Sequence, residues 1–288
     1  MNMPTNSFPL LSALILLPIA GAIVSAISPN GSKKIALISS VMQLLVSVLL
    51  VVSFDPSSGR QFVENCSWVP SMGISYSVGA DGISVAMILL NTVLTPLIIL
   101  SSFNRQIDQP RLFFPLILLM QSALIGVFVA TDGFLFYIFW ELALIPIYLI
   151  CLNWGGADRQ RITLKFFIYT LFGSLLMLVA LIWLSGQTTG HSFSIDAIYA
   201  LKTEASNQTW IFWAFFIAFA IKMPVFPFHT WQPDTYTDAP TQGTMLLSGI
   251  MLKMGIYGVI RWVLPITPIA MQLWGPTAIA LAVIGIVY

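Results

Sequence analysis

Charged residues are scarce in this 288-residue chain: they make up 8% of it, whereas hydrophobic residues make up 58%. A soluble globular protein of this length needs more charge to cover its surface. The composition therefore excludes a soluble globule and indicates a polytopic membrane protein. The formal net charge is only +1, so nothing suggests nucleic acid as a partner.

Cysteine is also scarce, with only Cys66 and Cys151 present. Neither belongs to a CxxC pair or a Cys/His cluster, which argues against a metal site, a haem or an iron–sulfur cluster carried by this chain alone. A redox centre, if one is involved, is expected in another polypeptide. Residues 1–7 lack the basic segment of a secretory signal, so the first apolar run is interpreted as a retained helix.

Long apolar runs dominate the sequence, and each is about 20 residues long, enough for a helix to cross about 30 Å of hydrocarbon. Eight complete spans are predicted, at residues 8–27, 35–54, 83–103, 112–130, 133–152, 164–185, 209–228 and 242–263. A ninth begins near Leu273, and the chain is expected to be cut short inside it.

The expected organisation has three parts. Residues 1–103 hold the first three spans and a polar loop at 55–80, residues 112–263 hold spans four to eight, and residues 268–288 begin the ninth. A short interfacial helix is expected around residues 194–205.

The basic residues between the spans give the chain an orientation by the positive-inside rule. One set of loops holds Lys33, Lys34, Arg105, Arg111, Arg159, Arg161 and Lys165, and the opposite side holds Arg60, Lys202 and Arg261. Because the richer set belongs inside, the N-terminus is expected outside.

Three charged residues, Glu141, Lys222 and Lys253, fall deep inside apolar spans. A charge at the bilayer centre costs about 2.5–3.5 kcal/mol on insertion scales, so such residues usually mark an ion or proton path. Pro146 follows Glu141 and is expected to kink its helix. A purely structural ion pair that fixes helix packing stays open as the alternative.

Lys222 is followed by Pro224 and Pro227, a spacing that predicts a helix break just past the lysine. Broken spans recur at transport sites, where irregular backbone meets protein or water. His229 follows, and a histidine can relay a proton near neutral pH, although an ordinary interfacial histidine is the alternative. Lys253 has Gly249 one turn before it, which lets a neighbouring helix approach closely.

The motifs around these residues resemble those of the antiporter-like, proton-pumping membrane subunits of respiratory complex I, the NADH:quinone oxidoreductase. They are Gly79-Ala80-Asp81-Gly82-Ile83-Ser84, Phe139-Trp140-Glu141-Leu142 with Pro146, Lys222-Met223-Pro224, Phe228-His229-Thr230-Trp231, Pro233-Asp234, Ala239-Pro240, Leu252-Lys253, and Tyr257-Gly258 with Arg261. Their order and spacing cover most of residues 79–261. Gln232 and Tyr236 depart from the family, which usually has a leucine at the first position and often a histidine at the second.

The resemblance implies an all-α, antiporter-like membrane fold with inverted five-helix repeats, of which this chain holds the first repeat and the N-terminal helices. It implies that Glu141 pairs with Lys222, that Lys253 passes protons onward, and that His229 lies near the relay. It further implies a bacterial inner-membrane subunit of a proton-translocating enzyme, with neighbouring antiporter-like chains and lipid as its partners. NADH, FMN, iron–sulfur clusters and quinone are expected in other subunits, with no cofactor or metal bound by this chain. A sodium/proton antiporter subunit and a structural scaffold remain the alternatives.

Overall fold

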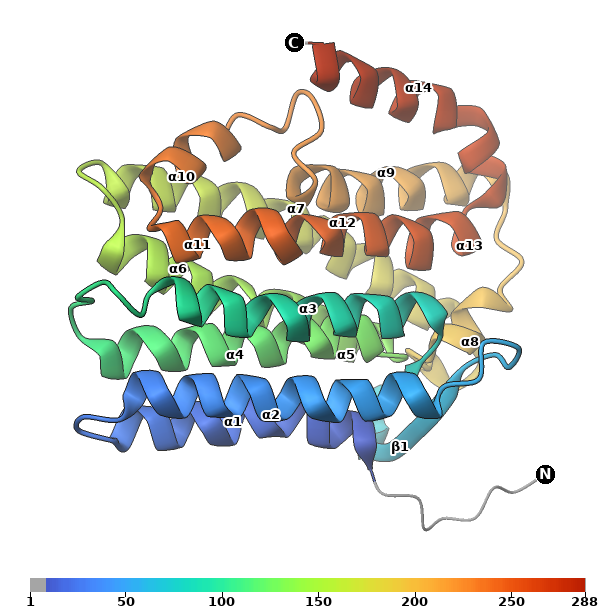
Figure 1. Ribbon diagram of the computed structural model, residues 1–288. Helices are drawn as coiled ribbons and strands as arrows, with labels where there is room; N and C mark the ends of the chain where they lie inside the picture. Colours follow the sequence, from blue (N-terminus) through green and yellow to red (C-terminus); the bar gives the residue numbers. More distant parts are fainter. Residues whose placement is uncertain (1–8, 288) are drawn as a thin grey trace.

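Long apolar helices run side by side through the molecule, with short elements gathered at the ends of the bundle (Figure 1). The computed structural model describes residues 9–287. Phe8, which begins the first predicted span, the segment before it and Tyr288 lie outside the described residues.

The first half of the chain is a helical layer with one β-hairpin. Its elements are α1 (Leu10–Ile27), α2 (Ser32–Ser53), β1 (Gln61–Val69), the short helix η1 (Pro70–Met72), β2 (Ile74–Ala80), α3 (Gly82–Ser101) and α4 (Pro110–Val129).

The second half holds the broken helices. Its elements are α5 (Gly133–Leu142), α6 (Leu144–Trp154), α7 (Arg159–Gln187), η2 (Thr189–His191), α8 (Ile195–Tyr199), α9 (Ala205–Lys222), α10 (Gln232–Asp238), α11 (Thr241–Leu246), η3 (Leu247–Met251), α12 (Leu252–Gly258), η4 (Val259–Val263), α13 (Leu264–Ile266) and α14 (Pro268–Val287). Of these, η3 and η4 are π-helical turns.

Eight helical segments within residues 9–287 are long and apolar enough to cross a membrane: 10–27, 32–53, 82–100, 110–129, 133–154, 159–187, 241–266 and 268–287. They correspond to the first six predicted spans, the eighth and the ninth, so a multi-pass membrane protein is confirmed. The seventh predicted span is the exception. Its helix, α9, ends at Lys222 instead of at residue 228, because Pro224 and Pro227 cannot continue it.

Helix α4 lies at the centre of the bundle, and the neighbouring helices pack around it. Of its most apolar 18-residue window, 89% is buried, against 33% in α1 and 11% in α14, whose other faces carry exposed apolar side chains. Polar groups tie α4 to its neighbours: Ser122 Oγ donates to the carbonyl of Ile15 at 2.6 Å, and Asn91 Nδ2 donates to the carbonyl of Gln121 at 3.0 Å. Such bonds satisfy polar groups that hydrocarbon would leave unpaired.

The predicted polar loop at 55–80 contains an antiparallel hairpin of β1 and β2. After the Pro70-Ser71-Met72-Gly73 turn, apolar or aromatic residues alternate with serine over residues 74–78, a pattern typical of a strand. Gly73 adopts φ 67°, and a Cβ there would lie 2.2 Å from the carbonyl oxygen of His191. Only glycine therefore fits this turn against the chain that follows α7.

The predicted break after Glu141 is present, since α5 ends at Leu142 and α6 begins at Leu144. Pro146, buried in the first turn of α6, accounts for it because it cannot donate to the carbonyl of Leu142. The short helix expected around residues 194–205 is α8, which covers only Ile195–Tyr199.

Candidate functional site

Glu141 lies at the end of α5, on the side that faces α7. Its side chain and that of Tyr137, one turn earlier, both interact with the hydroxyl of Ser174 on α7. Ser174 is buried and also donates to the carbonyl of Leu171 at 2.9 Å. One carboxylate oxygen of Glu141, Oε1, is buried and has no hydrogen-bond partner among the described residues. An unsatisfied carboxylate oxygen at this depth is costly, so its place calls for a functional reason.

Lys222 is the last residue of α9, and only 2% of it is exposed. Its ammonium lies 5.4 Å from the centre of the Trp140 ring, within the range of a cation–π contact. It also interacts electrostatically with Glu141. The three ion pairs closer than 4 Å that residues 9–287 form do not include Glu141 and Lys222. The two charges are therefore close enough to influence each other without being locked in direct contact.

Hydrogen bonds satisfy several of the backbone groups that the helix break after Lys222 leaves free. The amide of Met223 donates to the carbonyl of Phe219 at 2.8 Å, and the amide of Val225 donates to that of Ala220 at 2.9 Å. The indole N–H of Trp231 reaches back to the carbonyl of Ile221 at 2.9 Å. Irregular backbone at membrane depth is tolerated where protein satisfies it in this way.

His229 lies in this same connection, between α9 and α10, and is partly buried. Its ring stacks on that of Phe226 with the centres 5.6 Å apart. Helix α7 fastens the connection: Lys165 Nζ donates to the carbonyl of Thr230 at 2.7 Å and pairs with Asp234 at 2.9 Å. Lys165, which the sequence only counts toward orientation, thus also positions the segment that follows Lys222.

Lys253 is the second residue of α12, directly after the π-helical turn η3, and its ammonium donates to the carbonyl of Ser248. As expected from Gly249, a neighbouring helix comes close, because a Cβ on that glycine would lie 3.1 Å from Leu94 of α3. Gly255 in turn lies against Phe219 and Met223, so α12 packs directly on the end of α9. Single π turns inside α-helices are frequent at functional sites.

The structure thus brings Glu141 and Lys222 together and places Lys253 on a helix in contact with α9. His229 belongs to the connection after α9, seven residues beyond Lys222. Among residues 9–287, no three His, Cys, Asp or Glu side chains gather to hold a metal ion.

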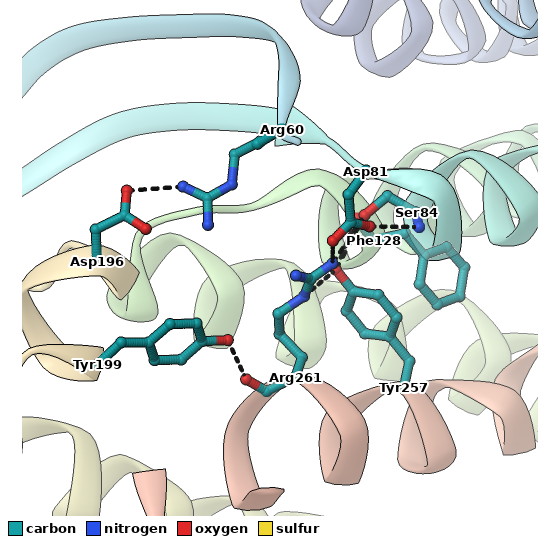
Figure 2. A network of polar contacts seen from close by, with 8 residues as sticks. All are labelled: Arg60, Asp81, Ser84, Phe128, Asp196, Tyr199, Tyr257 and Arg261. Carbon is teal, nitrogen blue, oxygen red and sulfur yellow. Dashed lines mark hydrogen bonds and ion pairs between the residues drawn. The ribbon is translucent and has the colours of Figure 1, made fainter. Parts of the chain in front are cut away.

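A second polar group of residues, at the other end of the eighth span, has no counterpart in the sequence expectations (Figure 2). Arg261 pairs with Asp81 at 2.6 Å and donates to the Tyr257 hydroxyl at 3.2 Å and to Ser84 Oγ at 3.3 Å. The Tyr257 hydroxyl donates to the carbonyl of Phe128 at 2.8 Å. The network therefore joins the start of α3, the junction of α12 with η4, and the end of α4.

Asp81 is also the N-cap of α3, because its carboxylate accepts the amide of Ser84 at 3.0 Å. Burial alone would raise the pKa of Asp81, but the hydrogen bond from Ser84 and the ion pair with Arg261 together hold that pKa below its usual value. The sequence flags Asp81 and Arg261 only as parts of motifs. Ser84 and Arg261 are hydrogen-bonded although they are 177 positions apart. The local sequence pattern around each residue does not indicate this contact.

Two further contacts surround this network in Figure 2. Arg60, just before β1, pairs with Asp196 of α8 at 2.8 Å, and the hydroxyl of Tyr199 donates to the carbonyl of Arg261. Burial raises the pKa of Tyr199 to about 12, so its hydroxyl stays a donor across the physiological range. Helix α8 is thereby tied both to the hairpin and to η4.

Fold and site together define a polytopic membrane protein with a half-buried acid on α5 and a buried base on α9, beside a broken span. Residues 130–288 match the model of a family described as NADH:quinone oxidoreductase/Mrp antiporter, transmembrane, and the chain belongs to this family.

Among curated relatives, the chain is 38% identical to the NADH-quinone oxidoreductase subunit M of Rickettsia typhi and 40% identical to that of Rhodobacter capsulatus, in each case over 97% of this chain. It is 41% identical, over 90% of its length, to an F(420)H(2) dehydrogenase subunit M of Methanosarcina mazei. The chain spans 59%, 58% and 54% of these relatives, respectively.

Two solved structures have the same fold. A chain of respiratory complex I from Thermus thermophilus with bound NADH aligns with a TM-score of 0.83 and 27% identity, over 92% of this chain and 55% of its own length. A chain of the Mrp complex from Dietzia aligns with a TM-score of 0.80 and 17% identity, over 91% of this chain and 29% of its own, and at that identity shows the fold alone. The antiporter-like membrane fold expected from the sequence is confirmed.

Proposed function

We propose that this chain is part of a proton-translocating membrane subunit of an NADH:quinone oxidoreductase, corresponding to subunit M. The observation that carries the proposal is the separated couple of half-buried Glu141 and buried Lys222, which ends the helix of a broken span. The relatives named NADH-quinone oxidoreductase subunit M support the choice of complex.

The separation of the couple matters for the mechanism. A negative Glu141 favours the proton on Lys222, and any movement that widens their distance weakens that preference. Trp140, whose ring faces the ammonium, stabilises the charged lysine without neutralising it. We assign loading of the proton to Lys222, control of its release to Glu141, and onward transfer to Lys253, with His229 beside the relay.

The redox reaction belongs, in this proposal, to other subunits, which hold NADH, FMN, the iron–sulfur clusters and quinone, and this chain binds none of them. Its partners are neighbouring antiporter-like subunits and lipid. Residues 1–103 then form the N-terminal helices, residues 112–263 the first translocating unit, and residues 268–288 the start of the next.

The location follows from the same reasoning. Seven of the chain's basic residues lie in the α3–α4 connection or in the first two turns of α2, α4 and α7. These segments are at one end of the bundle, and the hairpin lies at the other (Figure 1). By the positive-inside rule the first end faces the cytoplasm of a bacterial inner membrane, with the N-terminus outside.

The test uses the assembled complex in inverted membrane vesicles, with NADH oxidation and vesicle acidification measured together. For Lys222→Ala and Glu141→Gln we expect intact assembly and at least a tenfold loss of protons moved per NADH. Glu141→Asp should keep part of the activity, and Lys202→Ala, which removes an exposed lysine, should keep all of it.

Normal acidification by both buried-site variants in an intact complex would overturn the relay. Loss of assembly in both would favour the structural scaffold instead. The family also includes Mrp antiporters, so sodium uptake driven by an imposed proton gradient without NADH is measured in parallel. Uptake that disappears in Lys222→Ala would replace the oxidoreductase assignment with that of a sodium/proton antiporter subunit.

A further inference from the structure

A hollow of about 330 Å³ lies where four candidate spans end, between the α1–α2 turn and the α3–α4 connection. Two basic side chains, Lys33 and Arg105, line it together with Asn30 and Ser32, and Ile107 and Phe114 add apolar surface. We call it the basic hollow. Its place at the ends of spans is the level at which lipid headgroups meet a membrane protein.

The two cations are held in place by the fold. Lys33 Nζ donates to the carbonyls of Ser102 and Phe103 at 2.9 and 2.6 Å and lies 4.5 Å above the centre of the Phe103 ring. Arg105 donates from one guanidinium nitrogen to Thr241 Oγ1 at 3.1 Å. A lysine has three N–H donors and an arginine five, so both keep donors for a ligand.

No carboxylate lines the basic hollow, and this distinguishes it from the other hollows over the described residues that contain a basic side chain. The hollow beside Lys202 also contains Glu204, and the one at residues 156–161 contains Asp158. The small one beside Arg261 contains Asp81. The lining of the basic hollow carries two positive charges and no negative one, whereas the linings of these three carry a net charge of +1 at most.

The backbone adds to this charge, since the first residues of α2 and α4 contribute to the lining. These helices are 22 and 20 residues long, and neither N-terminus is capped by a side chain. Helix N-termini carry a partial positive charge that favours phosphate. Beyond the basic hollow, both helices present exposed apolar side chains, among them Ile38 and Leu45 on α2 and Leu112 on α4.

We propose that the basic hollow binds the phosphate headgroup of an anionic phospholipid, with the acyl chains lying along the exposed apolar face of α2. A free phosphate would satisfy the cations but would leave this apolar face unused, which is why we favour the lipid. The inference goes beyond proton translocation and depends only on the chain spanning a membrane.

The test uses the full-length protein in its purified complex, reconstituted into vesicles of phosphatidylcholine with a photoactivatable phosphatidylglycerol. Labelling of residues 29–33 and 105–114 is quantified by mass spectrometry. Each basic residue near an anionic headgroup strengthens binding by about fivefold. The double variant Lys33→Gln/Arg105→Gln should therefore label about 25-fold less at low probe density.

The matched control is Lys34→Gln/Arg161→Gln, which removes the same charge from the same end of the bundle but from residues outside the basic hollow. It should label as the unaltered protein does. Because Lys33 also supports the chain after α3, Lys33→Arg/Arg105→Lys is included and should restore labelling.

Four results would overturn the proposal. One is equal labelling of the test and control variants. Another is competition by inorganic phosphate as effective as competition by unlabelled phosphatidylglycerol, which would identify the ligand as a free anion. The third is cross-linking of residues 29–33 to a neighbouring subunit instead of to lipid. The fourth is undiminished labelling when a photoactivatable phosphatidylcholine, whose headgroup is zwitterionic, replaces the anionic probe, which would reject a site specific for anionic headgroups.

Discussion

The ion pair between Asp81 and Arg261 allows a quantitative prediction for Asp81→Asn. The variant removes the charge, while an asparagine oxygen can still accept the amide of Ser84 and cap α3. Breaking a fully buried pair costs about 3–5 kcal/mol, and an exposed pair contributes about 0–1 kcal/mol. The side chains of Arg261 and Asp81 are 16% and 29% exposed. We therefore expect unfolding to become easier by about 2 kcal/mol, between the two limits.

A double-mutant cycle isolates this contribution. The free energy of unfolding of the full-length protein is measured in mixed micelles with increasing SDS, for Asp81→Asn, Arg261→Gln and the double variant. The pair Arg60–Asp196 serves as the matched control, because its N–O distance of 2.8 Å is similar but Asp196 is 69% exposed. Its coupling should stay below about 1 kcal/mol. If the coupling of Asp81 with Arg261 is no larger than that of the control pair, burial is not what gives the pair its strength.

The same variant has a defined pH dependence. The pKa of Asp81 is lowered in the folded protein, so its ionised form contributes stability above the ordinary aspartate pKa of about 3.9. That contribution is lost as the pH falls through the lowered value. The difference between the unaltered protein and Asp81→Asn should stay constant from about pH 7 to pH 5 and shrink only below about pH 4. A stability advantage of the unaltered protein over Asp81→Asn that grows as the pH falls through about 6 would mean that burial dominates and that the pKa is raised.

Two packing features give further predictions. Gly126→Ala should destabilise the protein by about 1–3 kcal/mol, because its Cβ would lie 2.3 Å from the Phe139 ring. Gly186→Ala, which has open space around it, should be neutral or stabilising. Equal shifts of the melting temperature in the two variants would contradict this. Trp231→Phe should leave the carbonyl of Ile221 without its indole donor and cost about 1–3 kcal/mol. Hydrogen exchange of the amides in the connection after α9 should then speed up, and unchanged exchange would show that the indole bond does not hold that segment.

The membrane spans were predictable because hydrophobic length is a local property that each segment carries by itself. The break after Lys222 was predictable for the same reason, since Pro224 and Pro227 act on their own helix. The hairpin of β1 and β2 was not predicted, although the alternation over residues 74–78 and the Pro70–Gly73 turn are typical of one. A polar stretch between two apolar spans is equally typical of a loop.

The site was predictable only in part. Glu141 and Lys222 stand out because charge is costly inside an apolar run, and their proximity was an implication of family resemblance rather than of spacing. The network around Arg261 depends on contacts between α3, α4 and η4, which no local pattern encodes. The role of Lys165 in fastening the connection after α9 was likewise invisible, because a surface lysine beside a helix start is typical of any membrane loop.

The π-helical turn η3 has a geometric consequence for the span that carries both Lys253 and Arg261. A π turn accommodates one residue more than an α turn, so the side chains that follow it are rotated by about 100° relative to an uninterrupted helix. A helical wheel drawn through residues 241–266 therefore assigns the wrong face to everything after Met251. Deletion of one residue within Leu247–Met251 would leave hydropathy almost unchanged and yet turn Arg261 away from Asp81. The direction in which Arg261 points around its helix axis is therefore set by the number of residues in the π turn before it rather than by any neighbouring side chain.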